Sequence, residues 1–88
     1  MVQRPFSRNY SRNEQTVTTG FTPCAVCGKP IRDGAWPYAV HIHNGGDVIV
    51  TEAEAKTLDP AADLGGYPLG RDCLRNHPEL LPYVQEAA

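Results

Sequence analysis

The chain has 88 residues with a formal net charge of −2, and 41% of its residues are hydrophobic. This length predicts one small domain, and domains of this size commonly need a metal ion or disulfides for stability. Three cysteines cannot all pair within one chain, and the sequence contains no apolar run typical of a signal peptide or a membrane span. A secreted disulfide scaffold is therefore disfavoured, and we expect a cytoplasmic protein, with no membrane contact, that binds a metal.

The first 20 residues predict a flexible basic arm ahead of a folded domain over residues 21–88, and an arm that becomes ordered on a partner is the alternative. They are mostly polar, and their arginines recur every four residues without an obvious buried face. Residues 1–44 carry five basic against two acidic residues, whereas residues 45–88 carry three against eight. The arm and its neighbours are therefore a candidate surface for nucleic acid, although the acidic second half disfavours nonspecific DNA binding. The basic residues of this surface are Arg4, Arg8, Arg12, Lys29 and Arg32.

After a short strand predicted at Thr16–Phe21, two cysteines separated by two residues predict a zinc knuckle. Cys24 and Cys27 are near enough in sequence to chelate one ion, and Gly28 allows the backbone to turn sharply beneath it. A redox dithiol is the main alternative for this pair. Such a dithiol normally opens a helix, and Gly28-Lys29-Pro30 is not typical of a helix start.

The segment Ala35–His43 predicts the first strand of a hairpin, because apolar side chains alternate along it. Asn44-Gly45 suits a tight turn, and Asp47–Thr51 is the expected returning strand. His41 and His43 fall on the face opposite the apolar one, where we expect them to be surface residues. The side chains expected to face the core are Trp36, Tyr38, Val40 and Ile42.

Beyond the hairpin, the sequence Thr51-Glu52-Ala53-Glu54 has the form of a capping box and predicts a helix over residues 52–58. Three glycines and a proline in Ala61–Gly70 indicate a connecting loop. A helical turn is expected from Arg71, ending near His77 because Pro78 disfavours helical angles in the residue before it. A last helix is predicted at Pro78–Gln85.

The helical turn at Arg71 would place Cys73 and His77 four residues apart on one face. Together with Cys24 and Cys27 they would complete a Cys3His tetrahedron around a structural Zn²⁺. The alternative for Cys73 is a buried thiol without a ligand role. Two histidines of the hairpin, His43 and His41, are alternatives to His77 as the fourth ligand.

The order of knuckle, hairpin and helix-borne second ligand pair resembles a treble-clef zinc finger over Thr22–His77. This resemblance implies a small α+β domain stabilised by zinc. The chain also resembles small uncharacterised zinc-binding proteins of bacteriophages and actinobacteria. Treble-clef nucleases of the HNH type have a similar layout, which would make His41 or His43 a general base with Asn44 beside it.

The sequence contains no recognisable substrate pocket or phosphate-binding loop, and four ligands from the protein would leave the metal no open position for catalysis. We therefore expect a zinc-stabilised adaptor or regulatory module without catalytic activity that binds another protein. A zinc finger that binds nucleic acid through the basic arm is one alternative, and a degenerate HNH-type nuclease is another.

Overall fold

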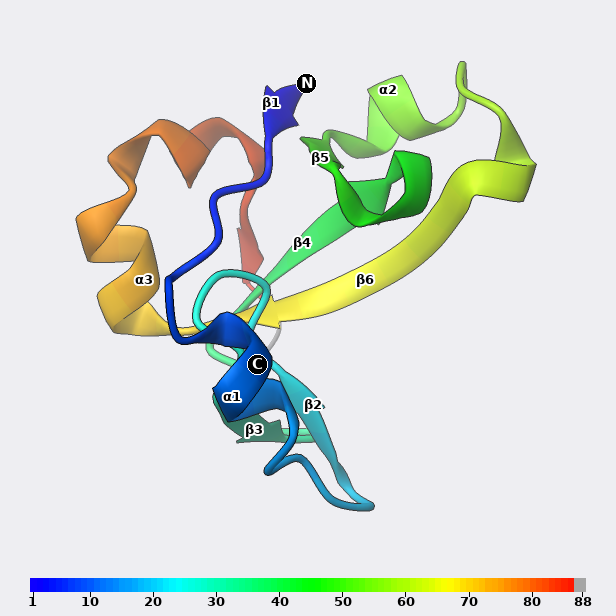
Figure 1. The fold of residues 1–88 in the computed structure, drawn as a ribbon. Coiled ribbons are helices and arrows are strands. Elements are labelled where there is room, and N and C mark those ends of the chain that lie inside the picture. Colours follow the sequence, from blue (N-terminus) through cyan, green and yellow to red (C-terminus); the bar gives the residue numbers. More distant parts are fainter. Residues whose placement is uncertain (87–88) are drawn as a thin grey trace.

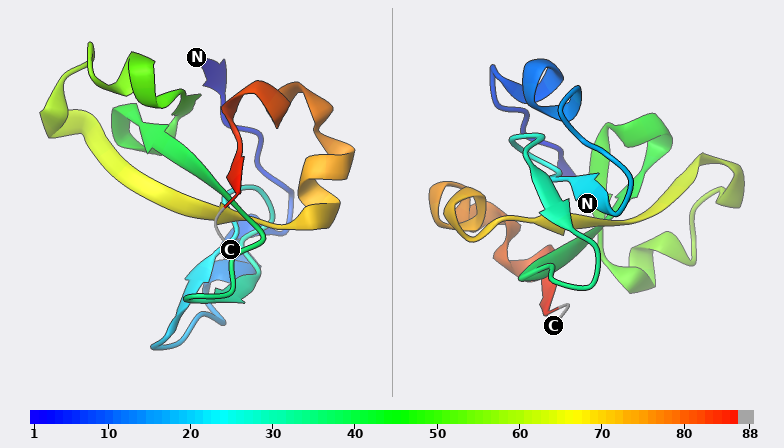
Figure 2. Two further views of the ribbon diagram at one scale, coloured as in Figure 1. Left: turned by 180° about the vertical axis from the view of Figure 1, so that it is seen from behind. Right: turned by 90° about the horizontal axis from the view of Figure 1, so that it is seen from below.

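Two antiparallel sheets form the framework of the computed structural model, which describes residues 1–86 (Figure 1). The larger sheet has the strand order β1-β5-β4-β6, with β7 also paired to β4. The smaller sheet is the β2–β3 hairpin, which projects from the larger one (Figure 2). The strands are β1 Val2–Gln3, β2 Phe21–Pro23, β3 Pro30–Arg32, β4 Tyr38–His43, β5 Val48–Val50, β6 Asp63–Leu69 and β7 Gln85–Glu86. The small α+β class predicted from the sequence is confirmed.

The hairpin of β4 and β5 lies within the segments that the sequence predicts, although β4 begins at Tyr38 and not at Ala35. Ile42 pairs with Ile49 across the two strands, and the 3₁₀ turn η1 (Asn44–Gly46) connects them. Both Asn44 and Gly45 have positive φ, at 56° and 70°. Asparagine and glycine tolerate this backbone region better than other residues, which explains why this dipeptide marks the turn.

The prediction of a connecting loop over residues 61–70 is wrong. Most of this segment forms β6, which pairs along the length of β4. β6 is an edge strand, so Pro68 removes no hydrogen bond to a second neighbour. Gly65 has a φ of 79°, and the register shifts between Ile42 and His43 near it. An edge position and a bulge therefore accommodate the residues that indicate a loop in the sequence.

The helices are short and agree with the prediction mainly at their starts. They are α1 Tyr10–Glu14, α2 Glu52–Ala55, η2 Pro60–Ala62, α3 Arg71–Asn76 and η3 Pro78–Tyr83. The capping box is confirmed: the Glu54 amide donates to Thr51 Oγ1, and the Thr51 amide donates to a Glu54 carboxylate oxygen. The expected helix over residues 52–58 ends early, and that over residues 78–85 is a 3₁₀ helix containing Pro82. Among the described residues, no helix combines the length and apolar character needed to cross a bilayer.

The N-terminal residues differ from the flexible arm expected from the sequence. Val2 and Gln3 pair with Val48 and Ile49 of β5, so β1 forms an edge of the larger sheet. Arg4 follows β1 directly and has a buried side chain. The Arg4 amide donates a hydrogen bond to the Asp47 carbonyl. The strand predicted at Thr16–Phe21 is also displaced, since β2 begins at Phe21.

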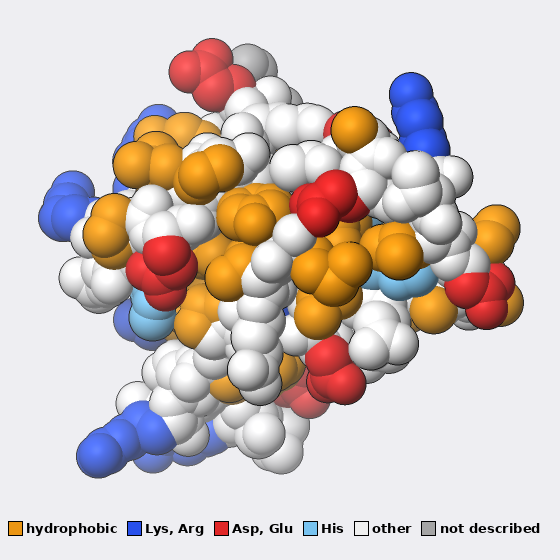
Figure 3. Space-filling view, turned by 90° about the horizontal axis from the view of Figure 1, so that it is seen from above, with side chains coloured by type: hydrophobic (Ala, Val, Ile, Leu, Met, Phe, Trp, Pro, Cys, Tyr) orange, Lys and Arg blue, Asp and Glu red, His pale blue; other side chains and the backbone are white. Residues whose placement is uncertain are grey.

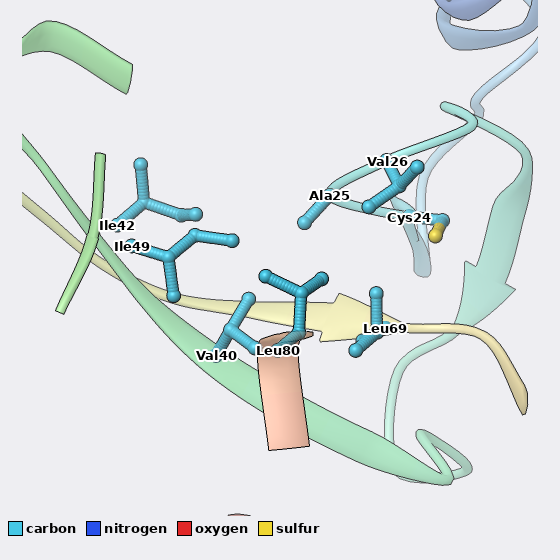
Figure 4. Packing of buried hydrophobic residues seen from close by; sticks show 8 residues of the cluster. All are labelled: Cys24, Ala25, Val26, Val40, Ile42, Ile49, Leu69 and Leu80. Carbon is cyan, nitrogen blue, oxygen red and sulfur yellow. The ribbon is translucent and has the colours of Figure 1, made fainter. Parts of the chain in front are cut away.

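A single apolar cluster joins the larger sheet to the cysteine knuckle (Figure 4). Ala25 and Val26, the two residues between the knuckle cysteines, point into this cluster, and Leu80 of η3 closes it from another side. The buried members are Cys24, Ala25, Val26, Val40, Ile42, Ile49, Leu69 and Leu80. The knuckle is therefore part of the core, and the position of its cysteines depends on how the sheet packs.

Candidate metal centre

The first two cysteines lie in a tight turn between β2 and β3. The Cys24 amide donates to the Lys29 carbonyl at 2.9 Å, and the Gly28 amide donates back to the Cys24 carbonyl at 3.0 Å. Gly28 has a φ of 77°, and a Cβ at this position would lie 2.5 Å from the carbonyl oxygen of Tyr10. Glycine is required here for two reasons, since both the left-handed backbone and the close approach of α1 exclude a side chain.

The third cysteine is brought to the knuckle by the end of β6. The Ala25 amide donates to the Pro68 carbonyl at 2.8 Å, which joins the knuckle to that strand. Gly70 is the N-cap of α3, and its amide donates a hydrogen bond of 3.4 Å to Cys24 Sγ. Cys73 is the third residue of α3, so its thiol points back to the same place.

The three sulfur atoms have the spacing of ligands to one ion. The Sγ atoms of Cys24, Cys27 and Cys73 all lie within 4.8 Å of one another, and Cys24 Sγ is 3.7 Å from Cys73 Sγ. Tetrahedral zinc with Zn–S bonds of about 2.3 Å separates two sulfurs by about 3.8 Å. A disulfide would need a separation of about 2.05 Å. The three cysteines are therefore free thiols with the spacing of a metal site, and thiolates are ligands that suit Zn²⁺.

The thiols of Cys24 and Cys73 shift each other's pKa in opposite directions. The hydrogen bond between the Cys24 and Cys73 thiols lowers the pKa of Cys24 to about 5. Burial opposes this shift, and backbone amides that include Gly70 add to it. The same hydrogen bond raises the pKa of Cys73, and burial adds to the effect. A bound cation would replace the proton that this pair shares, because metal ligation requires thiolates.

His77, the predicted fourth ligand, does not belong to the closely spaced group. It is the C-cap of α3 with φ −131° and ψ 67°, and its Nδ1 lies 3.2 Å from a carboxylate oxygen of Glu79. The backbone leaves helical angles at this residue because Pro78 follows it. His77 as a ligand therefore stays a prediction, whereas the cluster of three cysteines is observed.

His41 and His43 lie away from the cysteines. Tyr38, at the start of β4, pairs with Leu69 beside the knuckle, whereas His43 pairs with Asp63 at the other end. Five residues of strand separate the two ends by roughly 17 Å. Neither hairpin histidine therefore joins the group of closely spaced ligand atoms.

The prediction that His43 is a surface residue is wrong, and the same prediction for His41 is only partly confirmed. The His43 side chain is buried at 3% exposure, and its Nδ1 accepts a hydrogen bond from the Asn44 amide. His41 is half-buried between two carboxylates, with Nε2 2.7 Å from Asp63 and Nδ1 3.2 Å from Glu52. Sequence periodicity missed the burial of His43 because the bulge in the β4–β6 pairing lies at this residue.

The basic residues singled out in the sequence divide into two groups. Arg4 is 7% exposed, and its guanidinium donates to the carbonyls of Ala25 and Gly46 and to the Tyr10 hydroxyl. It is therefore not available to phosphate groups. The remaining four, Arg8, Arg12, Lys29 and Arg32, are exposed.

Comparison of the chain with protein-family models, with curated proteins and with solved structures gives no match, so the assignment of this centre rests on the geometry of its three cysteines.

Proposed function

We propose that the protein is a small zinc-stabilised binding module without catalytic activity. The observation that carries the proposal is the convergence of three sulfur ligands from two segments that are 46 residues apart in sequence, Cys27 and Cys73. An ion bound there would connect the knuckle to α3 across the core. Structural zinc contributes about 10–16 kcal/mol of apparent binding free energy, comparable to the entire stability of a small domain.

The proposed module is treble-clef-like. Its knuckle lies between β2 and β3, the β4–β5 hairpin follows, and α3 carries the third cysteine. This order supports the arrangement, and the burial of Ala25 and Val26 explains how the metal would act on the fold. Loss of the ion would release the knuckle and with it one side of the core.

Another protein is the proposed partner. Hydrophobic side chains gather in the middle of the face that carries β1 and η3, with acidic side chains among them (Figure 3). Met1 and Leu81 are the two most exposed large hydrophobic residues among those described, at 56% and 60%, and a contiguous exposed apolar patch is typical of an interaction site. An apolar surface with acidic neighbours favours a protein partner over nucleic acid, for which phosphate neutralisation provides most of the affinity.

The metal content of purified protein tests the proposal. We expect one Zn²⁺ per chain, removal of the ion by a strong chelator with loss of the folded circular dichroism spectrum, and recovery when zinc is added back. Protein that is fully folded and metal-free after purification would contradict the proposal.

A substitution on the apolar face tests the proposed partner. Leu81→Asp should abolish binding of a partner captured from the native cells, while Leu64→Asp, which changes another exposed leucine, should not.

A further inference from the structure

We propose that a metal held by the three cysteines keeps its fourth coordination position open to a surface cavity, where a small monoanion binds as an exchangeable ligand. The inference rests on the proposed zinc site and concerns what completes it. The ligand class is that of small monoanions with a metal-binding donor atom, such as a thiolate, azide or thiocyanate.

The cavity is the first observation. It measures about 630 Å³, and all three cysteines line it together with Lys29, Arg71 and Asn76. His77 is not among its lining residues, because it turns away at the end of α3 towards Glu79. The open side of the sulfur cluster therefore faces a space large enough for a small ligand.

Asn76 is the second observation. It lies three residues after Cys73 on α3, and side chains at this spacing share one helix face. A cysteine at this position would supply a fourth thiolate and close the site. Asparagine instead places a neutral amide there, which is a poor ligand for zinc but a good hydrogen-bond partner for a bound anion.

The charge around the cluster is the third observation. Three thiolates leave a bound Zn²⁺ with a local charge of −1, which by itself would disfavour an anionic ligand. Lys29 and Arg71 line the same cavity and bring two positive charges. Asp72 also lines it, but its carboxylate lies 3.3 Å from Arg75 Nη1. The site as a whole therefore tolerates one additional negative charge.

Cobalt substitution tests the inference with a readout that does not depend on any activity. The reduced full chain is loaded with Co²⁺, whose visible absorption bands report tetrahedral thiolate coordination, and is titrated with azide. We expect a saturable shift of these bands in the wild-type protein. Lys29→Gln and Arg71→Gln should each weaken azide binding by about two- to fivefold, as expected for exposed charges. Imidazole, a neutral ligand, should bind the variants and the wild-type protein alike.

Variants of the two candidate positions separate the alternatives. Asn76→Cys should remove the azide response and tighten cobalt binding. Asn76→Ala should keep a saturable azide response with weaker azide affinity, because the amide partner is lost, and it serves as the control for folding. His77→Ala should leave the spectrum and the azide response unchanged. A wild-type spectrum that ignores azide but changes in His77→Ala would overturn the inference alone and make His77 the fourth ligand. The lack of any tetrahedral thiolate spectrum would overturn the proposed zinc site itself.

Discussion

Arg4 Nε donates a hydrogen bond of 2.7 Å to the carbonyl oxygen of Ala25, which lies between the two cysteines of the knuckle. The same guanidinium lies 4.4 Å from the ring centre of Phe6 and 5.7 Å from that of Tyr67, within the range of cation–π contacts. The N-terminal segment is thus attached to the knuckle by a buried cation, whose charge is compensated by carbonyl oxygens and aromatic faces.

Replacement of this cation should destabilise the whole domain. Arg4→Ala leaves the buried carbonyls of Ala25 and Gly46 without this donor, so we expect a loss of about 2–4 kcal/mol in the free energy of unfolding. Denaturant unfolding of the zinc-saturated protein measures this loss of free energy. Arg8→Ala, which changes an exposed arginine of the same segment, should stay within about 0.5 kcal/mol of wild type. Equal effects of the two substitutions would contradict the structural role of Arg4.

Gly28→Ala should be more costly than the same change at another glycine of similar conformation. Both Gly28 and Gly34 have positive φ, at 77° and 86°, but a Cβ added to Gly28 would lie 2.5 Å from the Tyr10 carbonyl oxygen, whereas one added to Gly34 would have no atom within 4 Å. Gly34→Ala should lower the free energy of unfolding by about 1 kcal/mol because of its positive φ. Gly28→Ala should lower it by about 2–4 kcal/mol, because α1 must also move. Equal unfolding free energies for the two variants would contradict the close packing of Tyr10 on the knuckle.

Cys73→Ser should uncouple α3 from the knuckle. The variant retains the two cysteines of the turn but loses the ligand that spans the core, so zinc affinity should fall by at least about 100-fold, or 2.7 kcal/mol. Competition with a chromophoric chelator measures the affinity, and thermal unfolding with and without zinc measures the coupling to folding. Zinc should raise the melting temperature of wild type much more than that of the variant. An equal rise in both would place the metal elsewhere.

His41 should make stability depend on pH above about pH 6.5. Burial lowers the pKa of His41, but hydrogen bonds to Glu52 and Asp63 outweigh it, and the pKa is raised from 6.5. The backbone amide of Gly65, followed by His41, lowers the pKa of Asp63 from 3.8. The stabilisation of the folded state by protonated His41 is therefore complete below about pH 6.5 and is lost as pH rises through the raised pKa of the folded state. The Asp63 contribution is complete above about pH 3.8 and is lost as pH falls.

The pH dependence can be isolated with His41→Gln. Unfolding free energies of the zinc-saturated wild type and variant are compared between pH 6 and pH 9, where the metal contribution is common to both. The difference should shrink as pH rises, because the protonated imidazole exists only at the lower end. A difference that stays constant over this range would contradict the ion pairs of His41.

Local signals in the sequence predicted the elements whose causes are local. The capping box at Thr51 and Glu54 and the turn at Asn44-Gly45 lie where the pattern indicates, because each depends on contacts within a few residues. The knuckle of Cys24 and Cys27 is local in the same sense. The spacing of these cysteines could therefore be interpreted without knowledge of the rest of the fold.

The elements that depend on distant partners could not be predicted in this way. Glycines and Pro68 indicate a loop until β4 provides the pairing that makes them an edge strand. The N-terminal segment has no buried face of its own, but it gains one when Arg4 finds the carbonyls of Ala25 and Gly46. In both cases the stabilising group lies at least 20 residues away, where sequence periodicity carries no information.

The sequence by itself determined that this protein has a cysteine pair suited to a metal, a hairpin and a capped helix. Only the tertiary structure decided which groups meet: Cys73 reaches the knuckle, while His77 turns away towards Glu79 and Asn76 lines the cavity beside the sulfurs. The physical reason is that ligand identity follows from composition and spacing, whereas the direction of a side chain at a helix end follows from the backbone angles that Pro78 and the surrounding packing impose.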